Sequence, residues 1–445
     1  MANENLGRRD FMKVGGIAAA GLTMISGESR AQALRPAAAR EPARVWSPAW
    51  SNAVFPVEEK DRRWAKVRKL MARDGIDLIV CMPCTNSHDR GQADSRYLTQ
   101  LGENADETTV AFPVEGEVTA WHSRAGVWPA SNWVSSILSA QRGTGGATIA
   151  AWLRENPRFQ SSTIAIAALD STPLARVRAI EGEVNWGSVE LLKSAFPKAR
   201  FVSATPVLGE ARWQKSDAEI DFVRKGVRVA EITAEAMHRS AREGTRERHV
   251  FAQMMFANAD ADGSFTPMFG WVSGPLGRTY HRIEQPTFRK LEQGDVIITE
   301  IEGRWGGYIA QIDRTVLVGS PSPDFKDAMN LVFEAFNRVT AKMAPGATIR
   351  ELIEAGRVQG MNGRARTRLG LHGRGTGDDG PLVTGGTNDP RIFDIHLREN
   401  CAFVVKPSVT LDGADDYCRW GDSVVVTKGG GLRLGASSQE LLVQG

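Results

Sequence analysis

The sequence predicts two domains, an α/β domain followed by an α+β domain, and three observations support this prediction. The chain has 445 residues, of which 42% are hydrophobic and 24% charged, which suits two ordinary globular domains. Up to about residue 210, short strand-like runs alternate with helical runs, as in α/β domains. From Ser216 onward, a long amphipathic helix is followed by short strands, glycine-rich stretches and two further helices, as in α+β domains.

The first domain is expected over residues 57–210. The charged amphipathic stretch Glu58–Asp74 leads through Gly75 into the apolar run 76–80, which predicts a helix, a turn and a strand. Helical runs, the last of them at 189–195, separate the other strands of this domain. These strands are predicted at 109–112, 118–121 and 163–169.

The second domain is expected over residues 211–445. Asp217–Glu243 carries apolar residues at helical spacing, and Gly244 precedes the start of a second helix. Strands are then predicted at 295–301, 307–318, 401–405 and 422–426, and helices at 324–343 and 349–362.

The N-terminus has the three parts of an export signal. Paired arginines at positions 8 and 9 precede the apolar run 14–25, and Ala31-Gln32-Ala33 supplies a small-residue cleavage site. Paired arginines followed by Phe and Lys indicate the twin-arginine route. The apolar run is too short to cross a bilayer, which needs about 20 residues. We therefore expect a signal peptide over 1–33, an extended arm over 34–56, and a periplasmic or secreted mature protein.

The distribution of charge along the chain indicates which classes of partner to expect. The formal net charge of +3 is spread along the chain, so we expect no nucleic-acid partner, and we expect no membrane partner for the mature form. A small-molecule substrate and a second copy of the chain, in a homodimer, are the expected partners.

Cys81 and Cys84 form a C-M-P-C motif that we interpret as a structural or inert pair, because no thioredoxin-like pattern surrounds it. We expect no bridge between Cys401 and Cys418.

Five segments of the second domain form a recognisable series. They are K-S-D-A-E-I at 215–220, L-E-Q-G-D at 291–295 with G-Y at 307–308 and R-T at 314–315, G-R-G-T-G at 373–377, V-V-K-P at 404–407, and R-W-G-D-S at 419–423. In order and spacing they resemble the pita-bread family of aminopeptidase P, prolidase and creatinase. The resemblance implies a creatinase-like N-terminal domain followed by a pita-bread C-terminal domain.

The resemblance also locates the positions that hold two divalent ions in metal-dependent members of the family. Those members use two Asp, one His and two Glu, because adjacent cations need bridging oxygen ligands. The matching positions in this sequence hold Glu300, Gln311, Arg374, Lys406 and Gly421. A guanidinium or an ammonium group cannot ligate a metal ion and repels it. The sequence therefore predicts that the two-metal site is lost and that no cofactor is bound.

A displaced metal site is the alternative interpretation. Glu302 and Asp313 are spaced like the two lost acidic ligands, each two residues further along, and a shift of two keeps a side chain on the same face of a strand. His372 lies two residues before Arg374. With Glu300, these residues could hold a single ion, but a set of solvated or salt-bridged carboxylates is the simpler interpretation.

Without metal, acid–base groups must carry the chemistry, as they do in creatinase, which the chain resembles in this respect. His281 is the candidate proton-transfer group, because histidine titrates near neutral pH. Glu300 could orient His281 or activate water. Lys406 could act as a base or an electrophile.

The remaining candidates are predicted to contact the substrate. Arg374 suits a carboxylate, which a guanidinium binds through two parallel hydrogen bonds, and Tyr280 and Gln311 are the other predicted contacts. The leading hypothesis is a metal-independent hydrolase or lyase that cleaves a C–N bond of a small, carboxylate-bearing substrate, with a hydrolase favoured. The alternatives are a non-catalytic binding protein and an Xaa-Pro-type metallopeptidase with displaced ligands.

Overall fold

The computed structural model describes residues 55–84, 92–101, 108–122, 133–135, 137–263, 268–277, 285–387 and 389–444. The predicted signal peptide and arm lie outside these ranges, apart from Phe55 and Pro56. Within the ranges, no helix combines the length and apolar character needed to span a membrane.

The N-terminal domain is built on a six-stranded sheet with the order β4-β3-β2-β1-β5-β6 in the described part of the chain. Strand β1 pairs with β2 in antiparallel and with β5 in parallel orientation, so the domain is α/β as predicted. The strands are β1 (Leu78–Cys81), β2 (Thr108–Pro113), β3 (Thr119–His122), β4 (Ile137–Ser139), β5 (Thr163–Ile166) and β6 (Arg200–Ser203). The helices are α2 (Val57–Asp74), α3 (Ala93–Thr99), α4 (Gly145–Glu155), α5 (Trp186–Ala195) and α6 (Thr205–Trp213), with a 3₁₀ turn at Pro157–Phe159.

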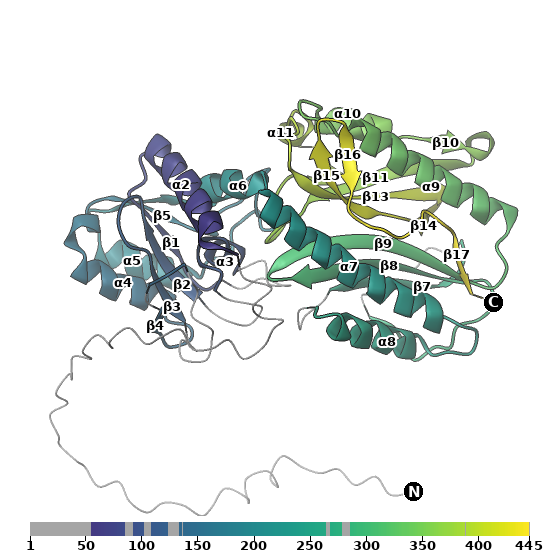
Figure 1. Cartoon of the computed structure of the whole chain (residues 1–445), viewed down its shortest axis with the longest axis horizontal. Helices are drawn as coiled ribbons and strands as arrows, with labels where there is room; N and C mark the ends of the chain where they lie inside the picture. Colours follow the sequence, from purple (N-terminus) through teal and green to yellow (C-terminus); the bar gives the residue numbers. More distant parts are fainter. Residues whose placement is uncertain are drawn as a thin grey trace, which may run out of the picture. The chain divides into compact units, whose positions relative to one another are not determined.

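The C-terminal domain contains two mainly antiparallel sheets, as Figure 1 shows. One has the order β17-β9-β8-β7, and the other has the order β10-β11-β13-β15-β16, with β12 on β11 and β14 on β13. The first sheet is formed by β7 (Phe269–Pro275), β8 (Asp295–Trp305), β9 (Tyr308–Val318) and β17 (Leu442–Gln444). The second is formed by β10 (Gln359–Gly360), β11 (Ala365–Gly373), β12 (Leu382–Val383), β13 (Ala402–Leu411), β14 (Ala414–Arg419), β15 (Asp422–Thr427) and β16 (Gly430–Arg433).

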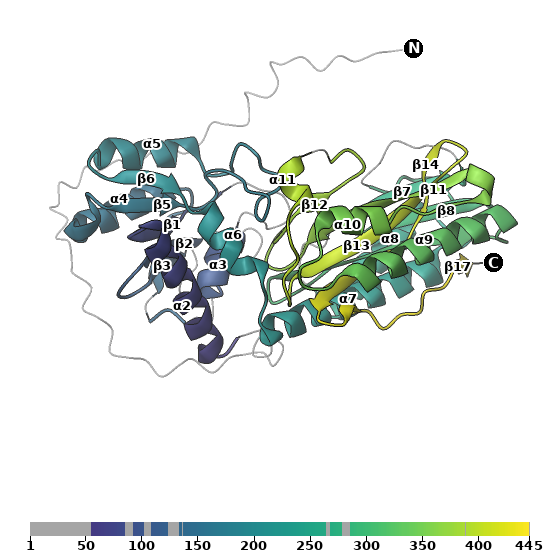
Figure 2. The same cartoon turned by 90° about the horizontal axis from the view of Figure 1, so that it is seen from above.

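Helices cover the outer faces of both sheets (Figures 1 and 2). Helix α7 packs on β8 and β9 and against α8, whereas α9 packs on β13 and against α10. The sheets therefore lie between two helical layers, the α+β architecture expected of a pita-bread domain. The helices are α7 (Asp217–Ser240), α8 (Glu247–Asp260), α9 (Pro323–Lys342), α10 (Ile349–Ala355) and α11 (Pro390–Phe393), with a 3₁₀ turn at Met361–Gly363.

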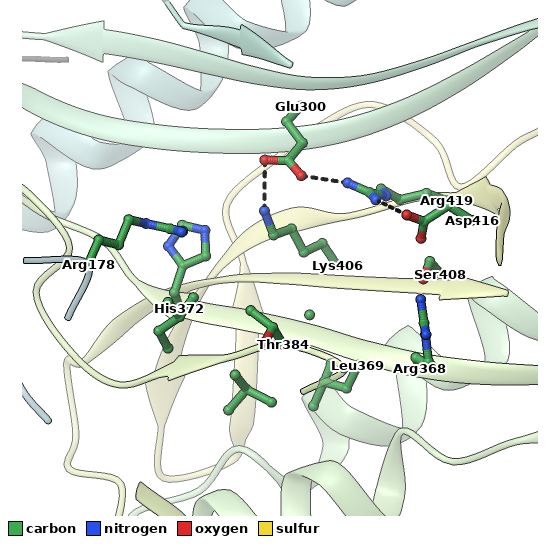
Figure 3. Close-up of a pocket in the computed structure, with 14 residues that line it drawn as sticks. Arg178, Glu300, Arg368, Leu369, His372, Thr384, Lys406, Ser408, Asp416 and Arg419 are labelled. Atoms are coloured by element: carbon green, nitrogen blue, oxygen red, sulfur yellow. Dashed lines mark hydrogen bonds and ion pairs between the residues drawn. The ribbon is translucent and has the colours of Figure 1, made fainter. Parts of the chain in front are cut away.

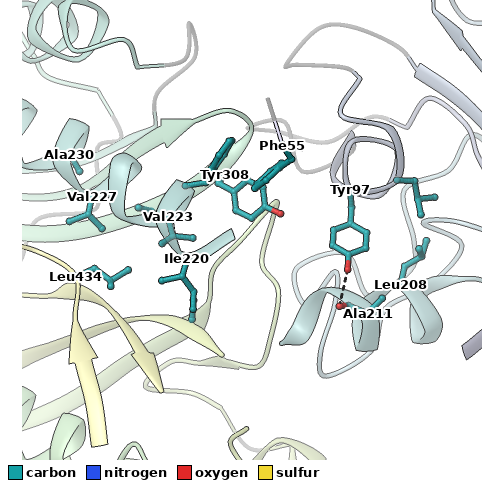
Figure 4. Close-up of a cluster of buried hydrophobic side chains, with 14 of the residues drawn as sticks. Phe55, Tyr97, Leu208, Ala211, Ile220, Val223, Val227, Ala230, Tyr308 and Leu434 are labelled. Carbon is teal, nitrogen blue, oxygen red and sulfur yellow. Dashed lines mark hydrogen bonds between the residues drawn. The ribbon is translucent and has the colours of Figure 1, made fainter. Parts of the chain in front are cut away.

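Helix α7 fixes the position of β8. It begins with a capping box, in which Ser216 and Glu219 satisfy each other's backbone N–H groups. Its apolar face packs into the core, as Figure 4 shows for Val223 and Val227. Gly303 of β8 has no room for a side chain, because a Cβ atom there would lie 1.9 Å from a carbonyl oxygen of α7. This close approach anchors the strand that carries Glu300 and Glu302.

The two sheets are joined where β9 meets the turn before β15. Asp313 and Gly421 exchange two backbone hydrogen bonds of 3.0 Å each. On either side, the Thr315 hydroxyl donates to the Arg419 carbonyl at 2.7 Å, and the Gln311 N–H donates to the Ser423 hydroxyl at 3.1 Å. Positions that are far apart in the sequence are therefore brought together at one junction between the sheets.

One predicted helix is shorter in the structure. A helix was expected over 349–362, but α10 ends at Ala355 and the chain turns into the short strand β10. Gly356 follows the helix, and Asn362 has a left-handed φ of 56°, which a helix cannot contain. Strand β11, which follows, was not predicted, although its residues alternate between buried and exposed positions from Ala365 to Leu369.

Candidate active site

The hairpin of β8 and β9 places four polar side chains on one face. Its register pairs Glu300 with Asp313 and Glu302 with Gln311. Residues paired directly across antiparallel strands, and residues two apart on one strand, share a face. Glu300 and Gln311, which are eleven residues apart in the sequence, therefore lie diagonally across the hairpin, where the Gln311 Nε2 lies 3.3 Å from a Glu300 oxygen.

The other predicted ligand positions meet this face. The Lys406 Nζ on β13 lies 3.0 Å from Glu300 Oε2, and Arg374 donates a hydrogen bond to the Gln311 side chain. Gly421 lies directly against Lys406, because a Cβ atom at position 421 would be 2.7 Å from the Lys406 Cβ. All five positions that the resemblance singled out thus converge at the junction of the sheets.

Arg374 is buried beneath this junction. Its side chain is 1% exposed and forms ion pairs with Glu302 at 3.0 Å and with Asp378 at 3.3 Å, in addition to its bond to Gln311. A guanidinium that is enclosed and bonded in this way cannot receive a substrate carboxylate. The predicted role of Arg374 as a direct substrate contact is therefore corrected to that of an internal counter-ion. Gln311 is also fully buried and bonded to its neighbours.

A further arginine completes the cluster. Arg419, at the end of β14, lies 2.5 Å from Glu300 Oε1, 3.3 Å from Asp313 Oδ2 and 3.0 Å from Asp416 Oδ2. No role was predicted for Arg419 from the sequence, although this residue belongs to the R-W-G-D-S segment. Burial, together with the nearby Glu300 charge, raises the pKa of Asp313 despite the opposing effect of Lys406 and Arg419.

A pocket of about 280 Å³ opens beside the cluster, mainly between β11, β12 and β13 (Figure 3). Among the described residues that line it, four are cationic, two are acidic and one is a histidine. Lys406 and Glu300 form part of its wall, whereas Arg374 and Gln311 do not line it. The cationic residues are Arg178, Arg368, Lys406 and Arg419, the acidic ones are Glu300 and Asp416, and the histidine is His372.

Comparisons with known proteins identify the two domains. Residues 63–214 match the model of the creatinase/prolidase N-terminal domain, and residues 221–428 match the model of metallopeptidase family M24. The C-terminal domain is therefore similar to the M24 metallopeptidases, and the N-terminal domain is similar to the creatinase/prolidase N-terminal domain. A curated relative, the Xaa-Pro dipeptidase of Pyrococcus horikoshii, is 25% identical over 272 residues, which cover 59% of this chain and 74% of the relative.

Solved structures of an aminopeptidase and a dipeptidase share the fold. The X-Pro aminopeptidase of Thermotoga maritima superimposes with a TM-score of 0.67 at 18% identity, covering 85% of this chain and 99% of that protein. The Xaa-Pro dipeptidase of Bacillus anthracis gives 0.65 at 20% identity, covering 86% and 99%. The predicted creatinase-like and pita-bread domains are thereby confirmed. The relatives named here are hydrolases, which agrees with the enzyme class that the sequence favoured.

The residues of this chain do not fit the two-metal site that the resemblance implies. Each carboxylate that remains at the junction is bound to a cation of the protein: Glu300 to Lys406 and Arg419, Glu302 to Arg374 and Arg304, and Asp313 to Arg419. Within the described ranges, no group of three or more His, Cys, Asp or Glu side chains is arranged to hold a metal ion.

The displaced site that was considered from the sequence fits no better. Glu302 is held between Arg374 and Arg304 at 3.0 and 2.8 Å, and the His372 Nδ1 lies 3.3 Å from Asp378 rather than beside Glu302 or Asp313. Burial, reinforced by the charges of Arg374 and Lys406, lowers the pKa of His372 to about 3.

Two predicted site residues, Tyr280 and His281, lie outside the described residues. Other residues were missed. Arg368 and Ser408 line the pocket from paired positions on β11 and β13, and Arg178 reaches it from the N-terminal domain. The alternating pattern of β11 could have indicated Arg368. No local signal in the sequence marks Arg178 or Ser408.

Proposed function

We propose that this protein is a metal-independent hydrolase that cleaves a C–N bond in a small, carboxylate-bearing substrate. One observation carries the proposal: cationic side chains of the protein bind Glu300, the one carboxylate that remains at the five metal-ligand positions, and also the neighbouring Glu302. Lys406 and Arg419 are bound to Glu300, and Arg374 is bound to Glu302 and Gln311. A divalent ion would have to displace these cations and would meet their repulsion.

The size and charge of the pocket support the substrate class. A volume of about 280 Å³ suits a molecule of the size of a dipeptide or smaller. Cationic side chains outnumber acidic ones on the described part of the lining by four to two. These features favour a ligand with an anionic group.

The lining residues offer the groups that hydrolysis needs. Glu300 is a carboxylate in the pocket wall and can accept a proton from an attacking water. The Lys406 Nζ, 3.0 Å from Glu300, can bind the carboxylate of the substrate and so hold the scissile C–N bond beside Glu300. The proton then passes from Glu300 to the leaving nitrogen. The Lys406 side chain is 11% exposed, so this charge acts in a largely water-excluded site.

The test is turnover in the presence of a chelator. Protein dialysed against EDTA is assayed with Xaa-Pro dipeptides and with N-carbamoyl and N-amidino amino acids. We expect turnover of at least one substrate in EDTA, loss of that turnover in Lys406→Met, and retention in Lys428→Met, which removes an exposed lysine instead. Turnover that appears only after Mn²⁺, Co²⁺ or Zn²⁺ is added would refute the proposal. Binding without turnover would favour a non-catalytic binding protein.

A second candidate function is an Xaa-Pro dipeptidase that uses metal. The names of the relatives and of the matching family, a metallopeptidase family, favour it. The cations at two of the converging positions, Arg374 and Lys406, and the neighbouring Arg419 count against it. The chelator experiment separates the two candidates directly, because the second requires added metal for every substrate.

A further inference from the structure

His372 combines a buried position with an unused hydrogen-bonding atom. Its side chain is 1% exposed and lines the pocket. The Nδ1 atom lies 3.3 Å from Asp378 Oδ1, but the buried Nε2 atom has no hydrogen-bond partner among the described residues. A buried polar atom without a partner destabilises the fold and is rare in native proteins. An atom of this kind in a pocket wall indicates a contact that a ligand completes.

The protein environment determines which proton His372 carries. Asp378 also accepts a hydrogen bond from the Arg178 Nε at 2.9 Å and forms an ion pair with Arg374 at 3.3 Å. A carboxylate bound to two guanidinium groups is ionised and can only accept, so the His372 Nδ1 must donate to it. In a neutral imidazole the other nitrogen is then an acceptor. The Nε2 of His372 therefore needs a ligand group that donates an N–H or O–H.

The sheet places this acceptor at a defined distance from the cationic wall. On β11, Arg368, Gly370 and His372 share one face, and the register pairs Gly370 with Lys406 and Arg368 with Ser408 on β13. Two residues along a strand span about 7 Å. Figure 3 shows His372 at one end of the pocket, Arg368 and Ser408 at the other, and Lys406 between them.

Gly370 leaves the space between these groups open. A Cβ atom at this position would approach the Lys406 Cγ to 3.1 Å, so the lysine stem lies across the glycine. The Lys406 ammonium group therefore lies above β11, between the side chains of Arg368 and His372. A ligand above Gly370 can reach Lys406 with an anionic group and His372 with a donor group.

We propose that the Nε2 of His372 accepts a hydrogen bond from an N–H or O–H group of the ligand, and that Asp378 is the residue that positions it. The ligand class is a small molecule with a carboxylate for Lys406 and an amide N–H or a hydroxyl group about 7 Å away or less. N-acylated amino acids and dipeptides have this arrangement. The carboxylate part rests on the proposed function, whereas the acceptor role of His372 does not.

Two matched probes test the acceptor. N-acetylglycine has a carboxylate and an amide N–H, and N-acetylsarcosine has the same carboxylate but a methyl group in place of that hydrogen. We expect N-acetylglycine to bind about tenfold more tightly, the effect of one hydrogen bond to an otherwise unpaired buried group. This preference should disappear in His372→Phe and persist in His396→Phe, which alters an exposed histidine. Equal affinities in the wild type, or a preference that survives His372→Phe, would overturn the proposal.

A second measurement uses only the wild-type chain, in case the His372 variant does not fold. Nitrogen-15 NMR of labelled histidines should show His372 with a protonated Nδ1 and a bare Nε2, and N-acetylglycine should shift the Nε2 signal. A protonated Nε2 in the free protein would overturn the proposal. If neither carboxylate probe binds, N-methylacetamide and N,N-dimethylacetamide replace them. A preference for N-methylacetamide that depends on His372 would then support the acceptor role of His372 and refute only the proposal that the ligand carries a carboxylate. If neither amide is preferred, both parts of the proposal are overturned.

Discussion

Replacement of Arg374 by Met is the sharpest test of its role as an internal counter-ion. Methionine keeps approximately the length of the side chain and removes its charge. The change leaves Glu302 and Asp378 without the ion pairs of 3.0 and 3.3 Å that Arg374 provides. It also leaves the Gln311 side-chain oxygen without its donor. We therefore expect Arg374→Met to lower the free energy of unfolding rather than to weaken ligand binding directly.

The size of the loss follows from the partners that remain. Removing one member of a buried ion pair costs about 3–5 kcal/mol, because the other charge stays buried. Here Glu302 keeps Arg304 at 2.8 Å, and Asp378 keeps Arg178 at 2.9 Å. The residual pairing places the expected loss at the lower end, about 3 kcal/mol. The loss should shrink at acid pH, where the unpaired carboxylates take up protons.

Urea unfolding followed by tryptophan fluorescence measures this loss at neutral and at acid pH. Arg350→Met is the matched control, because Arg350 pairs with Asp394 at 3.0 Å on the surface, where such a pair contributes about 0–1 kcal/mol. Adding Glu302→Gln to Arg374→Met should restore part of the stability by removing an unpaired charge. An Arg374→Met protein that unfolds within about 1 kcal/mol of the wild type would refute the counter-ion role. So would a loss that is the same at both pH values.

The remaining predictions concern a buried carboxylate, metal content and export. Burial raises the pKa of Asp422 to about 6 from its usual 3.8, so the contribution of this group to wild-type stability should fall as the pH rises from about 4 to 6. Asp422→Asn should remove this dependence and increase stability above pH 6 by at most about 3 kcal/mol, measured as urea unfolding against pH. Purified protein should contain less than one tightly bound divalent ion per chain, and EDTA should not change its melting temperature; stoichiometric metal by elemental analysis would contradict this. The precursor should be cut after Ala33, and replacement of both Arg8 and Arg9 by Lys should retain it in the cytoplasm; a double variant that is still exported would exclude the twin-arginine route.

The sequence by itself determined the two domains and the positions that converge at the junction of the sheets. A hairpin with a short turn has a fixed register, so a spacing of eleven residues is enough to place Glu300 and Gln311 on one face. The motifs of β13 and β15 likewise indicated Lys406 and Gly421. These inferences needed only local geometry and a resemblance in order and spacing.

Only the tertiary structure decided which partners the charged side chains have. Arg374 was expected to face the substrate, but it is buried against Glu302 and Asp378, whereas Arg178 reaches the pocket without any signal in the sequence. The reason is physical. A strand's register fixes the face on which a side chain lies, but the pairing and burial of a long cationic side chain depend on which other strands and loops close over it. Those neighbours come from distant segments, and their arrangement is a property of the folded chain.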